Sequence, residues 1–270
     1  MTNSIFIDGK RAQNVFSARS LFYGEGVFET FRYKASPPVL LDRHIERMRE
    51  GADLLKIPFP GKEYLIELIQ KAILESEIHD AYVKVCLLSE GEPDFYSVSI
   101  KSQVLVIIKE YLKSNQPLML KVNSYRRISE SPIGRVKSTN YLENILARRE
   151  ALSFGFDEAL FLNEKNQIAE CAASNLFWFK DETLFTPSEV CGLLVGTTRN
   201  LVLTSMADID INILEGKFLL NDLRDADFVF TTNSLTGCMP VSKIEGDSFN
   251  TENPLFLRIQ NALLKELRWI

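Results

Sequence analysis

The chain has 270 residues, of which 46% are hydrophobic, so it holds enough apolar material for one large domain or two modest ones. Its net charge of −5 and the absence of a basic run argue against a nucleic-acid-binding protein. The sequence has no stretch of about 18 apolar residues, the length that a membrane-spanning helix needs. The first residues lack the apolar core of a signal peptide, and we expect a cytoplasmic protein.

Cysteine and histidine usage narrows the chemistry further. The four cysteines are scattered with no CxxC pair, which is typical of reduced thiols. Only His44 and His79 are present, so a histidine-rich metal site is excluded and we expect no metal. A Ser-His-Asp triad would have to use one of these two histidines. If the protein is an enzyme, lysine, carboxylates or a cofactor must carry the reaction.

The first part of the chain predicts an α+β unit. Residues 4–13 are typical of a β-hairpin with Asp8-Gly9 in the turn. Residues 26–33 alternate apolar and polar side chains, which predicts a half-buried strand. Asp42 is the candidate N-cap of the helix that follows. Two helices at 42–55 and 61–76 and β-rich runs at 81–89 and 102–111 complete the unit.

Residues 112–120 are polar at their start and contain Pro117, so we interpret them as a linker between domains 1–115 and 116–270. The second domain is expected to hold a helix near Lys137 and a helix after 195–200. Its predicted strands lie at 158–163, 167–173, 175–180, 183–187 and 226–233, and its last helix lies at 255–269. Strands that occur in runs rather than in strict βαβ alternation favour an α+β fold.

Lys137 lies within "GRVKSTNYLENILARREA", which has apolar residues at helical spacing and ends near Gly155, a candidate C-terminal cap. We interpret Lys137 as the N-terminal edge of this helix, beside Arg135. Both the helix end and the arginine would lower the pKa of the amine, as Schiff-base chemistry needs. The alternative is a lysine that only extends into solvent.

Three weaker signals add to this one. Thr197 and Thr198 follow two glycines at a predicted helix start, which suits either a phosphate cradle or an ordinary N-cap. Glu170 precedes small residues, as either the partner of a protonated pyridine nitrogen or an exposed glutamate. Arg47 shares a helix face with His44, as either a phosphate ligand or a solvated charge. Together these parts are the ones that a pyridoxal-phosphate site needs.

The sequence also resembles the fold-type IV pyridoxal-phosphate enzymes, or class IV aminotransferases. This family includes branched-chain and D-amino-acid aminotransferases and 4-amino-4-deoxychorismate lyases. The similar blocks occur in order along nearly the whole chain. They are "YGEGVFETFR", "LLDRHIERM", "KSTNYLENILARREALSFGFDEALFLNEKNQIAECAASNLFWF", "LLVGTTRN" and "DFVFTTNSLTGCMPV".

The resemblance implies roles for individual residues. Lys137 matches the Schiff-base lysine, and Glu170 matches the carboxylate that pairs with the pyridine nitrogen. The phosphate-binding positions are matched by Arg47, Thr197, Thr198 and Ser234. Tyr141 and Asn175 match positions near the ring. The family also implies two domains with pyridoxal 5′-phosphate between them, and a homodimer whose partner contributes to the pocket.

The choice of reaction depends on what holds the substrate carboxylate. No arginine occurs between Arg49 and Arg126, and Ser89-Glu90 stands where relatives often carry Arg-Gly. The remaining candidates for binding the substrate anion are Lys84, Tyr96 and Arg32, the last of which could equally pair with a nearby acid. "NSLTG" favours a lyase that converts 4-amino-4-deoxychorismate to 4-aminobenzoate and pyruvate. The alternatives are a branched-chain or D-amino-acid aminotransferase and a non-catalytic pyridoxal-phosphate-binding protein.

Overall fold

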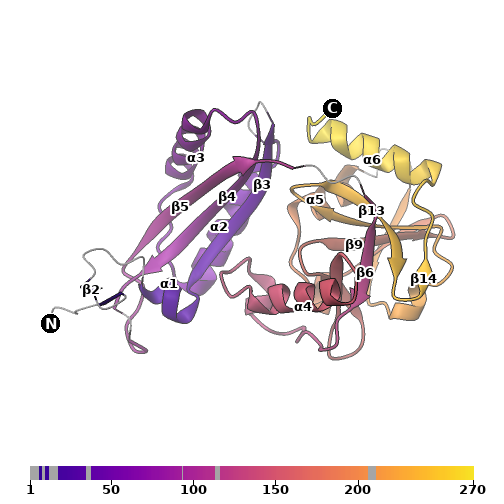
Figure 1. Ribbon diagram of the computed structural model, residues 1–270, viewed down its shortest axis with the longest axis horizontal. Helices are drawn as coiled ribbons and strands as arrows, with labels where there is room; N and C mark the ends of the chain where they lie inside the picture. Colours follow the sequence, from indigo (N-terminus) through magenta and orange to yellow (C-terminus); the bar gives the residue numbers. More distant parts are fainter. Residues whose placement is uncertain are drawn as a thin grey trace.

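The computed structural model describes residues 6–7, 10–11, 18–34, 38–92, 94–112, 116–205 and 211–270. Two sheets with flanking helices lie side by side (Figure 1). Within the described ranges, no helix is both long and apolar enough to cross a bilayer. The predicted α+β fold is confirmed.

The first sheet is antiparallel, in the order β3-β4-β5. Its strands are β3 (Gly26–Lys34), β4 (Asp80–Glu90) and β5 (Lys101–Glu110). The helices of this part of the chain are α1 (Ala18–Tyr23), α2 (Leu41–Leu55) and α3 (Lys62–Ser76). Apolar residues of α2 and α3, such as Ile45, Leu65 and Ile69, pack with Val83 and Val85 of β4 in one core. Burial of these side chains holds both helices on the sheet.

The second sheet has nine strands in the order β11-β10-β9-β12-β13-β6-β7-β8, and β14 pairs with β13. Its strands are β6 (Leu118–Val122), β7 (Glu158–Leu162), β8 (Ile168–Cys171), β9 (Asn175–Lys180), β10 (Thr183–Pro187), β11 (Asn212–Gly216), β12 (Phe228–Asn233), β13 (Gly237–Ile244) and β14 (Asp247–Ser248). The α-helices are α4 (Leu142–Ser153), α5 (Thr197–Ser205) and α6 (Pro254–Glu266). Three short 3₁₀ helices are η1 (Ile133–Arg135), η2 (Glu189–Cys191) and η4 (Leu220–Leu223).

Most predicted helices and strands occur close to their expected positions. The predicted hairpin is present as β1 (Phe6–Ile7) paired with β2 (Lys10–Arg11), while its turn, Asp8-Gly9, lies outside the described residues. β6 begins at Leu118, inside the segment interpreted as a linker. The elements not predicted from the sequence include α1, β6, β11, β13 and β14. The division into domains 1–115 and 116–270 stays a prediction.

Two local expectations are wrong. β3 is not half-buried, because both of its faces are covered. Glu29 is buried on the face of Val27 and Phe31, where an ion pair with Arg47 compensates its charge, and Phe28 is buried on the other face. Asp42 is not the N-cap of α2, since Leu40 holds that position without a side-chain hydrogen bond. Asp42 instead lies in the first turn, where its charge favours the helix dipole.

Strand β3 also joins the two parts of the chain. The backbone N–H of Phe28 donates to the carbonyl of Lys137 at 2.8 Å, and the N–H of Arg32 donates to the carbonyl of Ser234 at 3.0 Å. An antiparallel bridge pairs Val27 with Ser138. Two predicted site residues of the second part are therefore fixed against a strand of the first.

Candidate active site

A cavity of about 490 Å³ lies between β3 and β4 on one side and α4, β8 and α5 on the other. It gathers every residue predicted to bind the cofactor, together with one of the predicted substrate ligands. These residues are Arg47, Lys84, Lys137, Tyr141, Glu170, Asn175, Thr197, Thr198 and Ser234. The sequence separation of these residues shows that the cavity depends on the whole fold.

Lys137 projects into this cavity from an extended segment. Its Nζ lies 4.7 Å from the ring centre of Phe28 and 5.5 Å from that of Tyr141. Among the described residues it has no hydrogen-bond or ion-pair partner. Desolvation lowers the pKa of the amine to about 8, and the positive charge of Arg47 is the second cause. A neutral amine is thus available near physiological pH.

The predicted reason for this lowered pKa is wrong. α4 begins at Leu142, five residues after Lys137, so the end of that helix does not act on the amine as expected. Arg135 lies in η1 and is exposed, and it is not among the causes of the shift.

Gly155 follows the C-terminal end of α4 with a φ of +79°, as a C-terminal cap requires.

Glu170 lies on β8 and is 6% exposed. Its Oε1 accepts a hydrogen bond from Nη1 of Arg127, and its Oε2 accepts one from Nδ2 of Asn175 at 3.2 Å. Burial raises the pKa of Glu170, while the guanidinium of Arg127 opposes that shift. The guanidinium in turn lies 3.9 Å over the ring of Phe161. Sequence reasoning missed Arg127 because nothing local links it to a strand 43 residues later.

Hydroxyl groups gather at the start of α5. Oγ1 of Thr197 lies 3.0 Å from Oγ of Ser234, and Oγ1 of Thr198 donates to the same Ser234 oxygen at 3.5 Å. Ser234 is held in an Asx turn in which Asn233 Oδ1 accepts the N–H of Leu235 at 3.0 Å. The first amides of a helix have no partner within it, so this end combines free N–H groups with hydroxyls.

Gly196 permits the close approach of this helix start to the rest of the cavity. A Cβ at this position would lie 2.0 Å from Oδ1 of Asn175. The same Asn175 donates from Nδ2 to the carbonyl of Leu194 at 2.9 Å as well as to Glu170. One amide therefore bonds to residues at both ends of the cavity.

A buried carboxylate that sequence reasoning missed organises the same region. Oε1 and Oε2 of Glu29 accept hydrogen bonds from Nε and Nη2 of Arg47, both at 2.7 Å, and His44 Nδ1 lies 2.6 Å from Oε2. Burial would raise the pKa of Glu29, but Arg47 and His44 outweigh it and hold this pKa at about 2. The acid within "VFETF" was the only local signal, and it was taken for a solvent-facing position.

The three residues predicted to bind the substrate anion lie in different places in the structure. Lys84 lines the cavity, with Nζ 4.2 Å from the ring centre of Phe28. Arg32 does not line it, because its guanidinium pairs with Asp80 and stacks 4.2 Å from the ring of Tyr111. Tyr96 is 93% exposed and also lies outside the cavity. Of the three candidates, only Lys84 is among the described residues that line the cavity.

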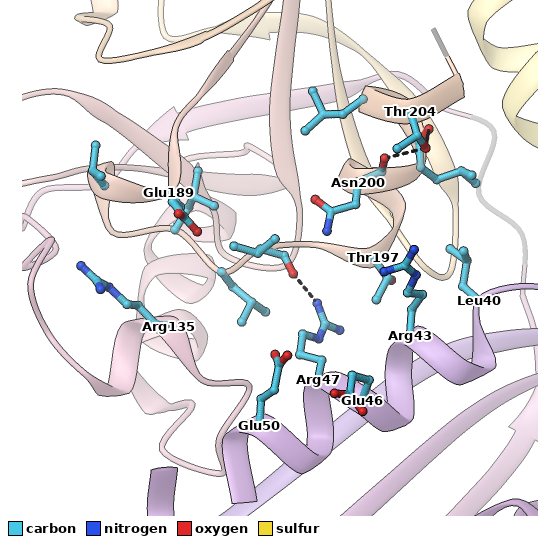
Figure 2. Close-up of a pocket in the computed structure, with 16 residues that line it drawn as sticks. Leu40, Arg43, Glu46, Arg47, Glu50, Arg135, Glu189, Thr197, Asn200 and Thr204 are labelled. Atoms are coloured by element: carbon cyan, nitrogen blue, oxygen red, sulfur yellow. Dashed lines mark hydrogen bonds between the residues drawn. The ribbon is translucent and has the colours of Figure 1, made fainter. Parts of the chain in front are cut away.

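Figure 2 shows a second cavity, of about 630 Å³, on the other side of Arg47. Nη1 of Arg47 donates across it to the carbonyl of Val195 at 2.9 Å. Side chains of α2, among them Arg43 and Glu50, form one wall, and α5 forms another. Arg47 and Thr197 line both cavities, so the second one reaches the back of the hydroxyl cluster.

Comparisons with known proteins agree with this geometry. The family model "Amino-transferase class IV" matches residues 26–244. Aminodeoxychorismate lyase of Bacillus subtilis (strain 168) is 33% identical over 261 residues, which cover 92% of this chain and 89% of the relative.

Solved structures are similar over nearly their whole length. A "Putative 4-amino-4-deoxychorismate lyase" from Legionella pneumophila superposes with a TM-score of 0.90 and 29% identity, covering 96% of this chain and 98% of its own. A branched-chain aminotransferase from Thermoproteus uzoniensis, solved with norvaline, gives 0.85 and 26%, covering 97% and 93%.

The lowered pKa of Lys137 generates a test with an aldehyde reagent. Treatment with pyridoxal 5′-phosphate followed by borohydride should place the label on Lys137, as mapped by mass spectrometry. The rate of labelling should rise with pH, with a midpoint near pH 8, because only the neutral amine attacks the aldehyde. Lys84→Gln should keep the label and Lys137→Gln should lose it. A label on another lysine would contradict this assignment.

Proposed function

The chain belongs to the class IV aminotransferase family, and we propose that it is a pyridoxal-phosphate-dependent lyase that converts 4-amino-4-deoxychorismate to 4-aminobenzoate and pyruvate. The observation that carries this choice is the full-length similarity to aminodeoxychorismate lyase, in sequence and in structure. The cavity supplies the chemical groups that such a reaction needs.

The residues of the cavity fit pyridoxal 5′-phosphate. The hydroxyls and free amides at the start of α5 would hold the phosphate, with Arg47 beside them. The carboxylate of Glu170 would hold a proton on the pyridine nitrogen, and Lys137 offers the amine for the aldehyde. When bound, the cofactor supplies an aldehyde that captures the substrate amine and a ring that accepts electrons.

Lys137 then acts on the substrate as a base. Its amine removes the proton from the substrate carbon that bears the nitrogen, and the electrons so released expel the enolpyruvyl group. The six-membered ring becomes aromatic, and the enolpyruvate takes up a proton to leave as pyruvate. A pKa of about 8 suits this work, because the amine both accepts and returns a proton near neutral pH.

The charges of the cavity favour a substrate whose carboxylates lie away from its amine. Arg47 and Arg127 are already bonded to Glu29 and Glu170. Among the described cavity residues, this leaves Lys84 and the exposed Arg148, besides the reacting Lys137 itself, as basic side chains without an ion pair. An amino acid needs a strong anchor for its α-carboxylate next to the reacting carbon, whereas the cyclic substrate presents two remote carboxylates.

Ser89 and Glu90, which stand where relatives often carry Arg-Gly, have partners within this chain. Ser89 is buried, and its hydroxyl donates to Oε2 of Glu25 at 3.1 Å. Oε1 of Glu25 lies 2.6 Å from Nη2 of Arg19, so the carboxylate and the guanidinium neutralise each other. Glu90 forms an ion pair with Lys101.

An aminotransferase for branched-chain or D-amino acids is the second candidate, favoured by the similarity to branched-chain aminotransferases. A non-catalytic carrier of the cofactor is less well supported, because storage alone needs neither the neutral amine of Lys137 nor the carboxylate of Glu170.

We also propose a homodimer that works in the cytoplasm, where the buried and free cysteines stay reduced. Apolar side chains that recur at helical spacing along α4 are exposed. They include Leu142 at 65%, Leu146 at 47% and Leu152 at 54% exposed. Ile145 of the same helix lines the cavity, so a second copy packed on α4 would border the site.

The dimer proposal is tested by charge insertion on α4. Leu146→Glu should shift the protein toward monomer in sedimentation velocity, because a carboxylate would be buried in the interface. Leu74→Glu on α3, where Leu74 is 77% exposed, serves as the matched control and should not change the assembly. A wild-type monomer at micromolar concentration would exclude the dimer.

Glu170→Gln tests the role of the carboxylate. The variant should retain cofactor binding but lose turnover by roughly 10²-fold or more, since a neutral amide cannot hold the proton on the pyridine nitrogen. Absorbance titration would measure binding, and 4-aminobenzoate formation would measure turnover. Turnover close to that of the wild type would show that Glu170 is not the partner of the ring.

The choice between the two reactions is tested by omitting the amino acceptor. A lyase regenerates its aldehyde in each cycle, so 4-amino-4-deoxychorismate alone should support many turnovers. Leucine or D-alanine should give only slow half-reactions, because Lys84 is a weaker carboxylate anchor than a bidentate arginine. Rapid transamination with 2-oxoglutarate and no 4-aminobenzoate would overturn the lyase assignment.

A further inference from the structure

A continuous row of polar side chains runs from the hydroxyl cluster at α5 into the core of the first sheet. Oγ of Ser234 lies 3.0 Å from Oγ1 of Thr197, which lies 3.5 Å from Nε2 of His44. Nδ1 of His44 lies 2.6 Å from the carboxylate of Glu29. His44 is 1% exposed.

The chemistry of the row fixes the direction of its protons. Glu29 is ionised, so it can only accept, and Nδ1 of His44 must carry the hydrogen. Burial lowers the pKa of His44, which leaves Nε2 as an acceptor for the hydroxyl of Thr197. Thr197 then accepts from Ser234, which accepts from Thr198. All three hydroxyl protons are used within the row and none is directed at the cavity.

While His44 is neutral, the charges around it disfavour the binding of a phosphate dianion. The groups that act on His44 are the carboxylate of Glu29 on β3, the guanidinium of Arg47 on α2 and the amine of Lys137 before α4. Arg47 forms two hydrogen bonds to Glu29, so its charge is already compensated. A dianion would meet the free N–H groups of the first turn of α5, but the hydroxyls would present lone pairs to it and the nearby charge of Arg47 is compensated by Glu29.

We propose that binding of a phosphate dianion at the start of α5 is coupled to uptake of one proton from solvent by Nε2 of His44. The inference rests on the proposed function only in that a phosphate binds there. Protonated His44 donates to Oγ1 of Thr197, which frees the hydroxyls of Thr197 and Ser234 to donate to the phosphate. The imidazolium lies between Glu29 and the phosphate and offsets the added charge.

Linkage gives the sign of the effect. Free His44 is neutral above its lowered pKa, and free phosphate esters are dianions above a pKa of about 6. Because the complex holds one more proton than its parts, affinity falls by up to about tenfold for each unit of pH above 7. A site that only orients hydroxyls would show no contribution of His44 to this slope.

The probe is 4-deoxypyridoxine 5′-phosphate, which lacks the aldehyde and cannot react with Lys137. Titration calorimetry at pH 7.0 and 8.0, in two buffers of different ionisation enthalpy, counts the protons taken up. His44→Asn keeps a donor toward Glu29 but cannot be protonated, so its uptake should be smaller by nearly one proton. His79→Gln, an exposed position, is the matched control and should behave as the wild type. The subtraction removes contributions from Lys137 and from the pyridine ring.

Nitrogen-15 NMR locates the proton, since the sequence has only two histidines and His79→Gln leaves His44 as the single signal. The Nε2 resonance should move from the unprotonated to the protonated range when the probe binds. Equal proton uptake in His44→Asn, or an unprotonated Nε2 in the complex, would overturn the inference while leaving phosphate binding intact. Failure of the probe to bind at all would instead count against the proposed function.

Discussion

The ion pair between Glu29 and Arg47 is the interaction on which the rest of the site depends. A carboxylate on β3 is 2% exposed, and it is tolerable there only because Arg47 and His44 of α2 satisfy it. The same two residues reach onward to Val195 and Thr197 in the second part of the chain. The buried carboxylate of Glu29 in the first sheet is thereby linked, through Arg47 and His44, to the start of α5 beside the second sheet.

Much of the fold could be predicted from the sequence, because long helices and strands carry their own periodicity. Lys137 and the threonines of α5 could be found from local composition and from the resemblance. Glu29 and Arg127 could not, since their importance lies in partners that only the folded chain supplies. The lowered pKa of Lys137 was expected for the wrong reason, because burial in a cavity has no local sequence signature.

Helix α4 shows a different limit of sequence reasoning. Its apolar spacing identified a helix correctly, and the structure leaves several of these apolar side chains exposed. Periodicity reports that a face is apolar without reporting what covers it. Arg32 shows the converse case, in which a plausible anion ligand is used for an ion pair and two aromatic contacts at the junction of the two parts.

The two hydrogen bonds that Nδ2 of Asn175 donates, to Glu170 and to the carbonyl of Leu194, tie the carboxylate to the segment that leads into α5. The absence of a side chain at Gly196 lets this segment lie close to Asn175. A molecule must therefore carry its basic nitrogen and its anion at a matching separation to engage both ends. Selection at such a cavity would depend on the spacing of a ligand's groups as well as on their charges.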